Sequence, residues 1–292
     1  MSGPAPLLAE RLRLRGGRSL DLAVPAVMGV INATPDSFSD GGRFSAPDDA
    51  VRAALAQLEE GAAIIDVGGE STRPGAAPVP AEEELRRVLP VIEGLRAQDP
   101  EAPISVDTSK ALVAKAALAA GADLVNDVTG LRDPRMAEVV AAAGAGLILG
   151  HLRGEPRTMQ RNPRYDDVLA EVAAELAAAR RRALAAGVPA EAIAVDPGIG
   201  FGKSLEHNLL LLGNLHRLHP LGPVVVGVSR KSLFGALLGR GLDERLAAGI
   251  GVAVACALEG GARLVRTHDV RATGDALRAA WEVHRRREGF GA

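Results

Sequence analysis

The feature that most constrains the fold is a repeated pair of segments, a short apolar run followed by a longer stretch of helical period. The apolar runs lie at 26–31, 63–67, 103–106, 124–128, 146–149, 193–195, 223–228 and 263–266. The helical stretches lie at 48–60, 81–98, 110–120, 134–143, 165–186, 205–218, 243–259 and 272–287. Continuously apolar strands are typical of a parallel sheet that is covered on both faces. Eight such units predict an α/β fold, a (β/α)8 TIM barrel. A doubly wound open sheet is the alternative, but it does not usually extend to so many similar units.

The length of the chain agrees with one barrel. It has 292 residues, of which 47% are apolar, and a barrel of this type needs roughly 250 residues. No linker or low-complexity segment divides the sequence, so we predict one domain over residues 1–292, with its core at about 24–283. Residues 11–24 predict a short N-terminal β-ribbon that turns at Gly16 and Gly17 and covers the bottom of the barrel.

The composition excludes several classes of protein. The net charge of −2 argues against a nucleic-acid partner, because such binding needs a strong basic field. The single cysteine, Cys256, cannot form an internal disulfide, which fits a reducing cytoplasm. The N-terminus lacks the basic region of a secretory signal. The longest uncharged apolar stretch, 246–258, has 13 residues, fewer than the roughly 20 that span a membrane. We therefore expect a cytoplasmic protein with no membrane partner.

Polar side chains lie near the carboxyl end of each apolar run or directly after it. In a TIM barrel the carboxyl ends of all strands meet on one face, where the chemistry takes place, so these side chains predict a functional site. The residues concerned are Asn32, Asp66, Asp107, Asn126, Asp127, His151, Asp196, Ser229, Arg230, Lys231, Arg266, His268 and Asp269.

The residue types at this face suggest two kinds of recognition. Two carboxylates, Asp107 and Asp196, and the Asn126 amide suit a flat polar heterocycle with amino and N–H groups. As alternatives, each aspartate could be a helix N-cap, and the asparagine could satisfy backbone groups in a loop.

The cations at the same face suit an anion. Lys231, Arg266 and His268 follow the last two runs, and together they fit a phosphate or a carboxylate. A Schiff-base aldolase that uses Lys231 is the least favoured alternative, because the adjacent Arg230 suggests an anion site with a charged lysine.

Two loops rich in Gly, Ser and Pro follow the first two runs, at 32–42 and 68–75. Ordinary solvated loops have the same composition. However, Phe38 stands among polar residues in a chain with only 2% aromatic residues, which indicates a lid over a substrate. The glycine-rich segment 196–203 lacks the spacing of a nucleotide-binding P-loop.

Several segments together resemble one known family, dihydropteroate synthase. The resemblance extends from about Val24 to about Val283, in order and without large gaps. It is carried by the motifs at 32–42, 66–75, 105–109, 126–127, 196–203, 229–232 and 266–269.

The resemblance implies a pterin-binding TIM-barrel transferase of folate biosynthesis. Such an enzyme joins (7,8-dihydropterin-6-yl)methyl diphosphate to 4-aminobenzoate, giving 7,8-dihydropteroate and diphosphate, with Mg²⁺ as cofactor. It also implies a homodimer. From the residues alone, the Ala- and Gly-rich helix at 246–261 could pack on a second copy or on its own barrel.

The resemblance also implies roles for individual residues. Those assigned to the pterin are Asp107, Asn126, Asp196 and Lys231, with Arg266 against the pterin face. The diphosphate is assigned to Arg266, His268 and Asn32, with the Thr267 backbone as a further contact and Asn32 reaching Mg²⁺. Residues expected to close over 4-aminobenzoate are Phe38, Asp40, Thr72, Arg73 and Pro74, with Ser232 meeting its carboxylate at the start of a helix.

Two other functions remain open from the sequence. A catalytically silent pterin-binding paralogue would be favoured by loss of Asn32, Asp40, Thr72 or Arg73, and all four are present. A folate-methyl methyltransferase could share the pterin-binding residues but would not need the two loops or the 229–232 motif.

The chain also departs from the family pattern in places. Gly150 and Leu152 stand where methionines are common, Arg153 where glutamine is common, and Ile199 where phenylalanine is common. Gly150 is expected to leave the pterin wall short of material.

Overall fold

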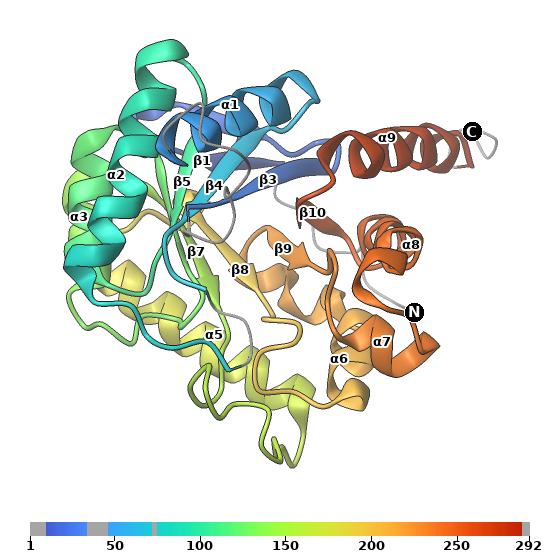
Figure 1. Ribbon diagram of the computed structural model, residues 1–292. Helices are drawn as coiled ribbons and strands as arrows, with labels where there is room; N and C mark the ends of the chain where they lie inside the picture. The colour runs from blue at the N-terminus through green and yellow to red at the C-terminus, as the bar shows by residue number, and fades with distance from the viewer. Residues whose placement is uncertain (1–9, 34–45, 72–74, 288–292) are drawn as a thin grey trace.

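Eight parallel strands close into a barrel in the computed structural model, which describes residues 10–33, 46–71 and 75–287. The order around the barrel is β10-β3-β4-β5-β6-β7-β8-β9, and helices surround the strands on the outside (Figure 1). The strands are β3 Ala26–Asn32, β4 Ile64–Gly68, β5 Ile104–Asp107, β6 Leu124–Asp127, β7 Gly146–Gly150, β8 Ile193–Asp196, β9 Val224–Gly227 and β10 Ala262–Thr267. The predicted TIM barrel is therefore confirmed.

The outer layer consists of helices that alternate with the strands along the chain. They are α1 Ala46–Glu59, α2 Ala81–Gln98, α3 Ala111–Ala120, α4 Met136–Ala143, α5 Val168–Ala185, α6 Leu205–Leu212, α7 Leu233–Leu238, α8 Leu246–Leu258 and α9 Val270–Arg287. Short 3-10 turns are η1 Arg15–Gly17, η3 Ala190–Ala192, η4 Leu215–Leu221 and η5 Leu242–Glu244. Apolar side chains on the outer faces of the strands, such as Val67, Val106 and Leu147, are buried against these helices in the main core.

The N-terminal ribbon closes the bottom of the barrel, as predicted. Strands β1 Arg11–Arg13 and β2 Ser19–Asp21 pair antiparallel around the turn at Gly16 and Gly17. Their leucines form a second core with inward-facing residues of the barrel strands; this core comprises Leu12, Leu14, Leu20, Leu22, Met28, Ile64, Leu124, Ile148, Ala194, Val225 and Leu264. Because apolar residues fill this end, an open site can form only at the carboxyl ends of the strands.

Most of the predicted helices start and end within three residues of the observed bounds, but two of the predicted stretches include a separate 3-10 turn. The stretch 205–218 is not one helix: α6 ends at Leu212, before Gly213, and η4 follows and contains Pro220, which cannot continue an α-helix. The predicted helix at 243–259 starts later, at Leu246, after η5. The six-residue helix α7 between Leu233 and Leu238 was absent from the predicted set and corresponds only to the helix start expected at Ser232.

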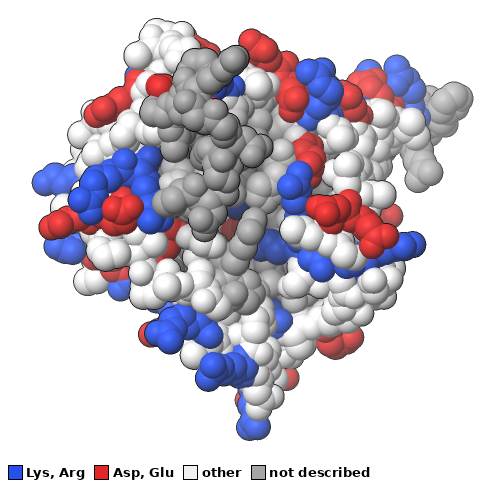
Figure 2. Space-filling view, in the orientation of Figure 1, with Lys and Arg blue, Asp and Glu red and all other residues white. Residues whose placement is uncertain are grey.

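The surface carries charges of both signs. Figure 2 shows acidic and basic side chains interspersed over the face it presents, in agreement with the net charge of −2. Within the described ranges, no helix combines the length and the apolar character needed to cross a membrane.

Candidate active site

Side chains from four strands meet at the carboxyl end of the barrel. Asp66 lies on β4, Asp107 ends β5, Asn126 lies opposite Asp107 on β6, and Arg266 comes from β10. Arg266 donates from Nε to Asp66 Oδ2 at 2.6 Å and from a terminal nitrogen to Asp107 Oδ2 at 2.9 Å. The closed order of strands brings residues that are 200 positions apart in the chain, Asp66 and Arg266, into one ion pair.

Asp66 anchors this network; the sequence placed it at the functional face but gave it no individual role. It is completely buried and accepts hydrogen bonds from Arg266, from Asn126 Nδ2 at 2.9 Å and from Ser105 Oγ at 2.6 Å. A buried carboxylate is stable only when its oxygens are paired in this way. Its position near the end of the apolar run 63–67 placed it at this face, but the sequence did not indicate its partners.

Asp107 is held where a negative charge is costly. The side chain is 8% exposed, and burial raises its pKa to about 7, although the Arg266 guanidinium acts in the opposite direction. The alternative role as a helix cap is wrong, because Asp133 Oδ2 instead accepts from the backbone N–H of Ala111 at the start of α3, at 3.0 Å. A carboxyl group with such a pKa facing a cavity is typical of an active site.

Asp196 at the end of β8 lies beside a cation. Burial raises the pKa of Asp196, while the Gly198 N–H and the charge of Lys231 lower it. Its Oδ1 accepts from the Gly198 N–H at 2.7 Å in the turn after the strand. The alternative role as a helix cap is wrong, because the N-cap of α6 is Ser204. Burial lowers the pKa of Lys231 to about 8, against the favourable charge of Asp196.

A cavity of about 370 Å³ opens above this network. The predicted residues among those that line it are Asn32, Asp107, Ser229, Arg230, Lys231, Ser232, Arg266 and His268. Ser232 directly precedes α7, in agreement with the expected helix start. Glu70 also lines the cavity and is held by an ion pair with Lys110. The cavity thus joins carboxylate, amide and cationic groups in one space.

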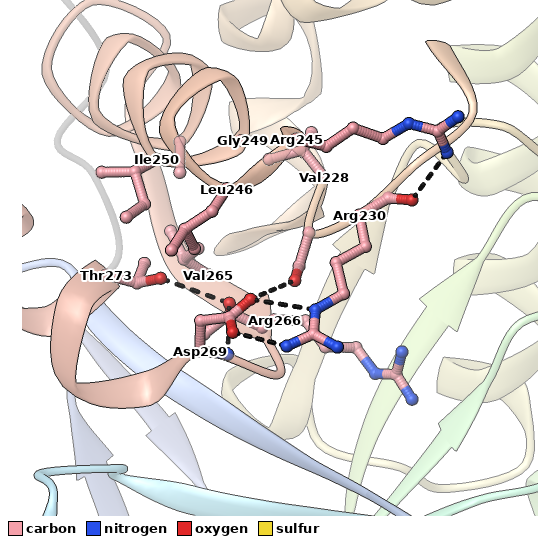
Figure 3. Close-up of a pocket in the computed structure, with 13 residues that line it drawn as sticks. Val228, Arg230, Arg245, Leu246, Gly249, Ile250, Val265, Arg266, Asp269 and Thr273 are labelled. Atoms are coloured by element: carbon pink, nitrogen blue, oxygen red, sulfur yellow. Dashed lines mark hydrogen bonds and ion pairs between the residues drawn. The ribbon is translucent and has the colours of Figure 1, made fainter. Parts of the chain in front are cut away.

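The loops after β9 and β10 are tied together behind the cavity. Arg230 pairs with Asp269 at 2.6 Å, and Ser229 Oγ lies 3.2 Å from His268 Nδ1. Figure 3 shows the Arg230–Asp269 pair, with the Arg266 guanidinium extending past it and away from the side chains of α8. The space drawn there, between α8 and the two strands, has a volume of only about 10 Å³, so it cannot hold a substrate.

Thr267 lies on the far side of the network from the cavity. Its hydroxyl is buried and lies 3.2 Å from the Thr273 hydroxyl of α9. The side chain therefore joins β10 to α9, and the assignment of Thr267 to a ligand concerns its backbone alone. The predicted site residues Phe38, Asp40, Thr72, Arg73 and Pro74 lie outside the described residues.

The backbone at Gly150, one of the departures from the family pattern, leaves no room for a side chain. A Cβ atom on Gly150 would lie 2.5 Å from the Val128 Cα, so the Val128 backbone occupies the space of a side chain. The position of a methionine side chain is thus filled by backbone, although Gly150 also lines a separate cavity of about 280 Å³ between this strand end and α5. Ile199 is buried in the main core.

The donor set for a metal ion is sparse. Among the described ranges there is no cluster of three or more His, Cys, Asp or Glu side chains that could hold a metal ion. Asn32 lines the cavity with Arg266 and His268. Mg²⁺ in proteins often keeps water and takes only one or two protein ligands beside substrate phosphates. One amide oxygen at an anion site fits that mode of binding, and it does not fit a closed all-protein cage.

A barrel with this set of strand-end groups belongs to the class of TIM-barrel enzymes that bind a polar heterocycle beside an anion. Residues 28–268 match the family model described as pterin binding enzyme. The chain is 49% identical over 263 residues to the dihydropteroate synthase of Escherichia coli K12, covering 90% of this chain and 93% of that protein. The chain belongs to the dihydropteroate synthase family, whose members are transferases of folate biosynthesis.

Solved structures of the family have the same fold. The Xanthomonas albilineans dihydropteroate synthase with 4-aminobenzoic acid has a TM-score of 0.87 at 47% identity, covering 94% of this chain and 98% of that one. The Burkholderia cenocepacia enzyme complexed with 7,8-dihydropteroate has a TM-score of 0.85 at 45% identity, covering 97% and 99%.

Proposed function

We propose that the chain condenses (7,8-dihydropterin-6-yl)methyl diphosphate with 4-aminobenzoate to give 7,8-dihydropteroate and diphosphate. The observation that carries this proposal is that one cavity is lined by two kinds of group, the Asp107 carboxylate and the nitrogen donors of Arg266 and His268. Such a cavity suits a substrate that is a neutral polar heterocycle at one end and a polyanion at the other.

The pterin is assigned to the deep part of the cavity. Asp107 and Asp196 supply acceptors for ring N–H and amino groups, Asn126 supplies an amide, and Lys231 donates to ring acceptors. In this structure Arg266 donates to Asp107, so an entering pterin must share that carboxylate with the guanidinium or replace it. The bond from Arg266 to Asp66 can keep the arginine in place during this exchange.

The diphosphate is assigned to Arg266, His268 and Asn32, with the Thr267 backbone as a further contact. Mg²⁺ would be held by Asn32 together with substrate oxygens, and when bound it would neutralise negative charge on the leaving group. His268 is oriented by Ser229, whose hydroxyl lies 3.2 Å from Nδ1. The Arg230–Asp269 pair holds the two loops that carry these residues.

The reaction separates charge, and the residues of this chain are placed to stabilise both parts. The C–O bond to diphosphate breaks with its electron pair on the leaving oxygen, and the arylamine lone pair forms the new C–N bond. Arg266 and His268 offset the charge on the diphosphate, while Asp107 and Asp196 stabilise the electron-poor pterin methylene. The arylamine nucleophile needs no strong base, and its proton passes to solvent or diphosphate.

The 4-aminobenzoate is assigned to the mouth of the cavity. Ser232 lines the cavity directly before α7 and would meet the carboxylate. The remaining residues assigned to this substrate are Phe38, Asp40, Thr72, Arg73 and Pro74, which belong to the two loops outside the described residues.

The assembly we propose is a homodimer formed through α7, η5 and the start of α8, in the cytoplasm. Four leucines in this region are 40–60% exposed, namely Leu237, Leu238, Leu242 and Leu246. Exposed apolar side chains that gather in one region often mark an interface. Sedimentation velocity should give a dimer for the chain and a monomer for Leu238→Glu, and a monomeric parent chain would refute the proposed interface.

The reaction can be tested by measuring dihydropteroate formation from the two substrates with Mg²⁺ and after its removal with EDTA. We expect product only with both substrates, and a large loss after chelation that added Mg²⁺ restores. Full activity in EDTA would remove the metal from the proposal but leave the condensation. Absence of product with tight pterin binding would instead identify a silent pterin-binding protein.

A further inference from the structure

Lys203 is a buried amine outside the cavity. It is 2% exposed and follows the glycine-rich loop 197–202, which connects β8 to α6. Burial lowers the pKa of Lys203 to about 7, whereas the charge of Asp196 raises it. Burying an amine in this way is costly unless its N–H groups are paired.

The surroundings of Lys203 match the hydrogen bonds of an ammonium group. Its Nζ lies 2.9 Å from the Gly198 oxygen, 3.0 Å from the Phe201 oxygen and 2.9 Å from His151 Nδ1. The His151 backbone oxygen is a fourth acceptor at 3.3 Å, so the three N–H bonds of the ammonium group have an acceptor each. His151 must accept through Nδ1 and can then donate from Nε2 to Glu175 Oε2, 3.0 Å away. Burial lowers the pKa of His151 to about 3, so the ring is neutral and fits this arrangement.

The loop lies directly on the backbone of the neighbouring strand end. A Cβ on Gly198 would lie 1.8 Å from the His151 oxygen, and one on Gly202 would lie 2.1 Å from the Arg153 oxygen. Both glycines also have positive φ, +67° and +64°, which other residues rarely adopt. These positions require glycine, and they bring the loop carbonyls within reach of Lys203.

The opposite side of the same loop holds Lys231. The Ile199 oxygen accepts from Lys231 Nζ at 2.5 Å, and this nitrogen lies 4.1 Å from the centre of the Phe201 ring. At Gly200 a Cβ would lie only 3.3 Å from the Lys231 side chain. The loop thus has Lys203 bound to its Gly198 and Phe201 carbonyls and Lys231 bound to the carbonyl between them.

We propose that Lys203 is a positioning residue for Lys231: its amine fixes the 197–202 loop so that the Ile199 carbonyl and the Phe201 ring direct the Lys231 ammonium into the pterin subsite. This inference rests on the proposed role of Lys231 in pterin binding. Without Lys203 the Gly198 and Phe201 carbonyls would lose buried partners, and the loop would have to move to find others.

The test compares Lys203→Met with Lys231→Met at pH 6.5, using calorimetric binding of the dihydropterin methyl diphosphate and steady-state kinetics. We expect both variants to raise the Kd for the pterin substrate, Lys203→Met by about tenfold. The KM for 4-aminobenzoate should change by less than about twofold, because Ser232 is on a different loop. A general loss of structure would instead weaken the binding of both substrates.

A matched pair at His151 provides a second route if Lys203→Met does not fold. His151→Gln keeps an acceptor for Lys203 and a donor for Glu175, whereas His151→Leu removes both. We expect the glutamine variant to bind the pterin like the parent chain and the leucine variant to bind it several-fold more weakly.

The outcomes separate this inference from the proposed function. Unchanged pterin affinity in Lys231→Met would refute the assigned role of Lys231 itself. Weakened binding in Lys231→Met, with parent-like binding in folded Lys203→Met or equal binding in the two His151 variants, would overturn the positioning role alone.

Discussion

Replacing Asp107 by asparagine removes one charge from the centre of the site and keeps the shape of the side chain. The carboxylate accepts from Arg266 at 2.9 Å and is 8% exposed, so its charge acts in a poorly solvated place. One hydrogen bond to a charged group contributes about 1.5–3 kcal/mol, and a preorganised group that stabilises transition-state charge contributes about 10²–10³ in rate. We therefore expect kcat/KM for the pterin substrate to fall about 10²–10³-fold in Asp107→Asn.

The same substitution should not destabilise the barrel. Burial raises the pKa of Asp107 above its ordinary value, so the ionised carboxylate costs stability as pH rises towards and through about 7, and asparagine removes that cost. Arg266 also keeps its bond to Asp66 at 2.6 Å. The assay is diphosphate release at pH 8, with the thermal midpoint measured alongside. Asp275→Asn, at an exposed site on α9, is the control. Near-full activity in a folded Asp107→Asn would refute the assigned pterin subsite.

The value of kcat/KM should rise as pH passes about 7, where Asp107 ionises, and fall as pH passes about 8, where Lys231 loses its proton. A profile that does not fall on the acidic side would contradict the role of the carboxylate. Asp66→Asn should lower kcat and reduce the free energy of unfolding in urea by about 3 kcal/mol, because Asp66 is completely buried and three side chains donate to its carboxylate. A fully stable, active variant would show that this charge is dispensable. Gly198→Ala should abolish pterin binding. Its control is Gly239→Ala, which has a similar φ of +69° and nothing within 4 Å of the new Cβ; it should keep pterin binding and lower the free energy of unfolding by only about 1–2 kcal/mol. Equal effects in the two variants would show that contact with the neighbouring strand is unimportant.

The barrel could be predicted because its signal is local and repeated. Each strand is an apolar run such as 26–31, and the helix that follows has apolar residues at helical spacing. Each of the eight units can therefore be recognised separately. The inward placement of Asp107 and Asn126 followed from the rule that strand carboxyl ends converge. The exact ends of the helices were harder to predict. The break after Leu212 depends on Gly213 and Pro220, and the spacing of apolar residues does not reveal such a break.

Pairings between distant side chains could not be read from the sequence. Asp66 belongs to the 66–75 motif, but its partner Arg266 can be identified only when β10 is placed in the closed barrel. The partner of Lys203 could not be predicted either, because its acceptor His151 lies at the end of another strand. The surroundings of Gly150 could not be predicted for a related reason: the backbone that fills the space beside it is that of Val128, which directly follows the neighbouring strand β6.

The central claim is that this cavity joins an arylamine to a pterin and expels diphosphate, and one measurement tests it most directly. Diphosphate release is followed with the dihydropterin methyl diphosphate and Mg²⁺, in the presence and in the absence of 4-aminobenzoate. The account predicts release that depends on the arylamine and matches the dihydropteroate formed mole for mole. Tight pterin binding with no arylamine-dependent release would contradict it.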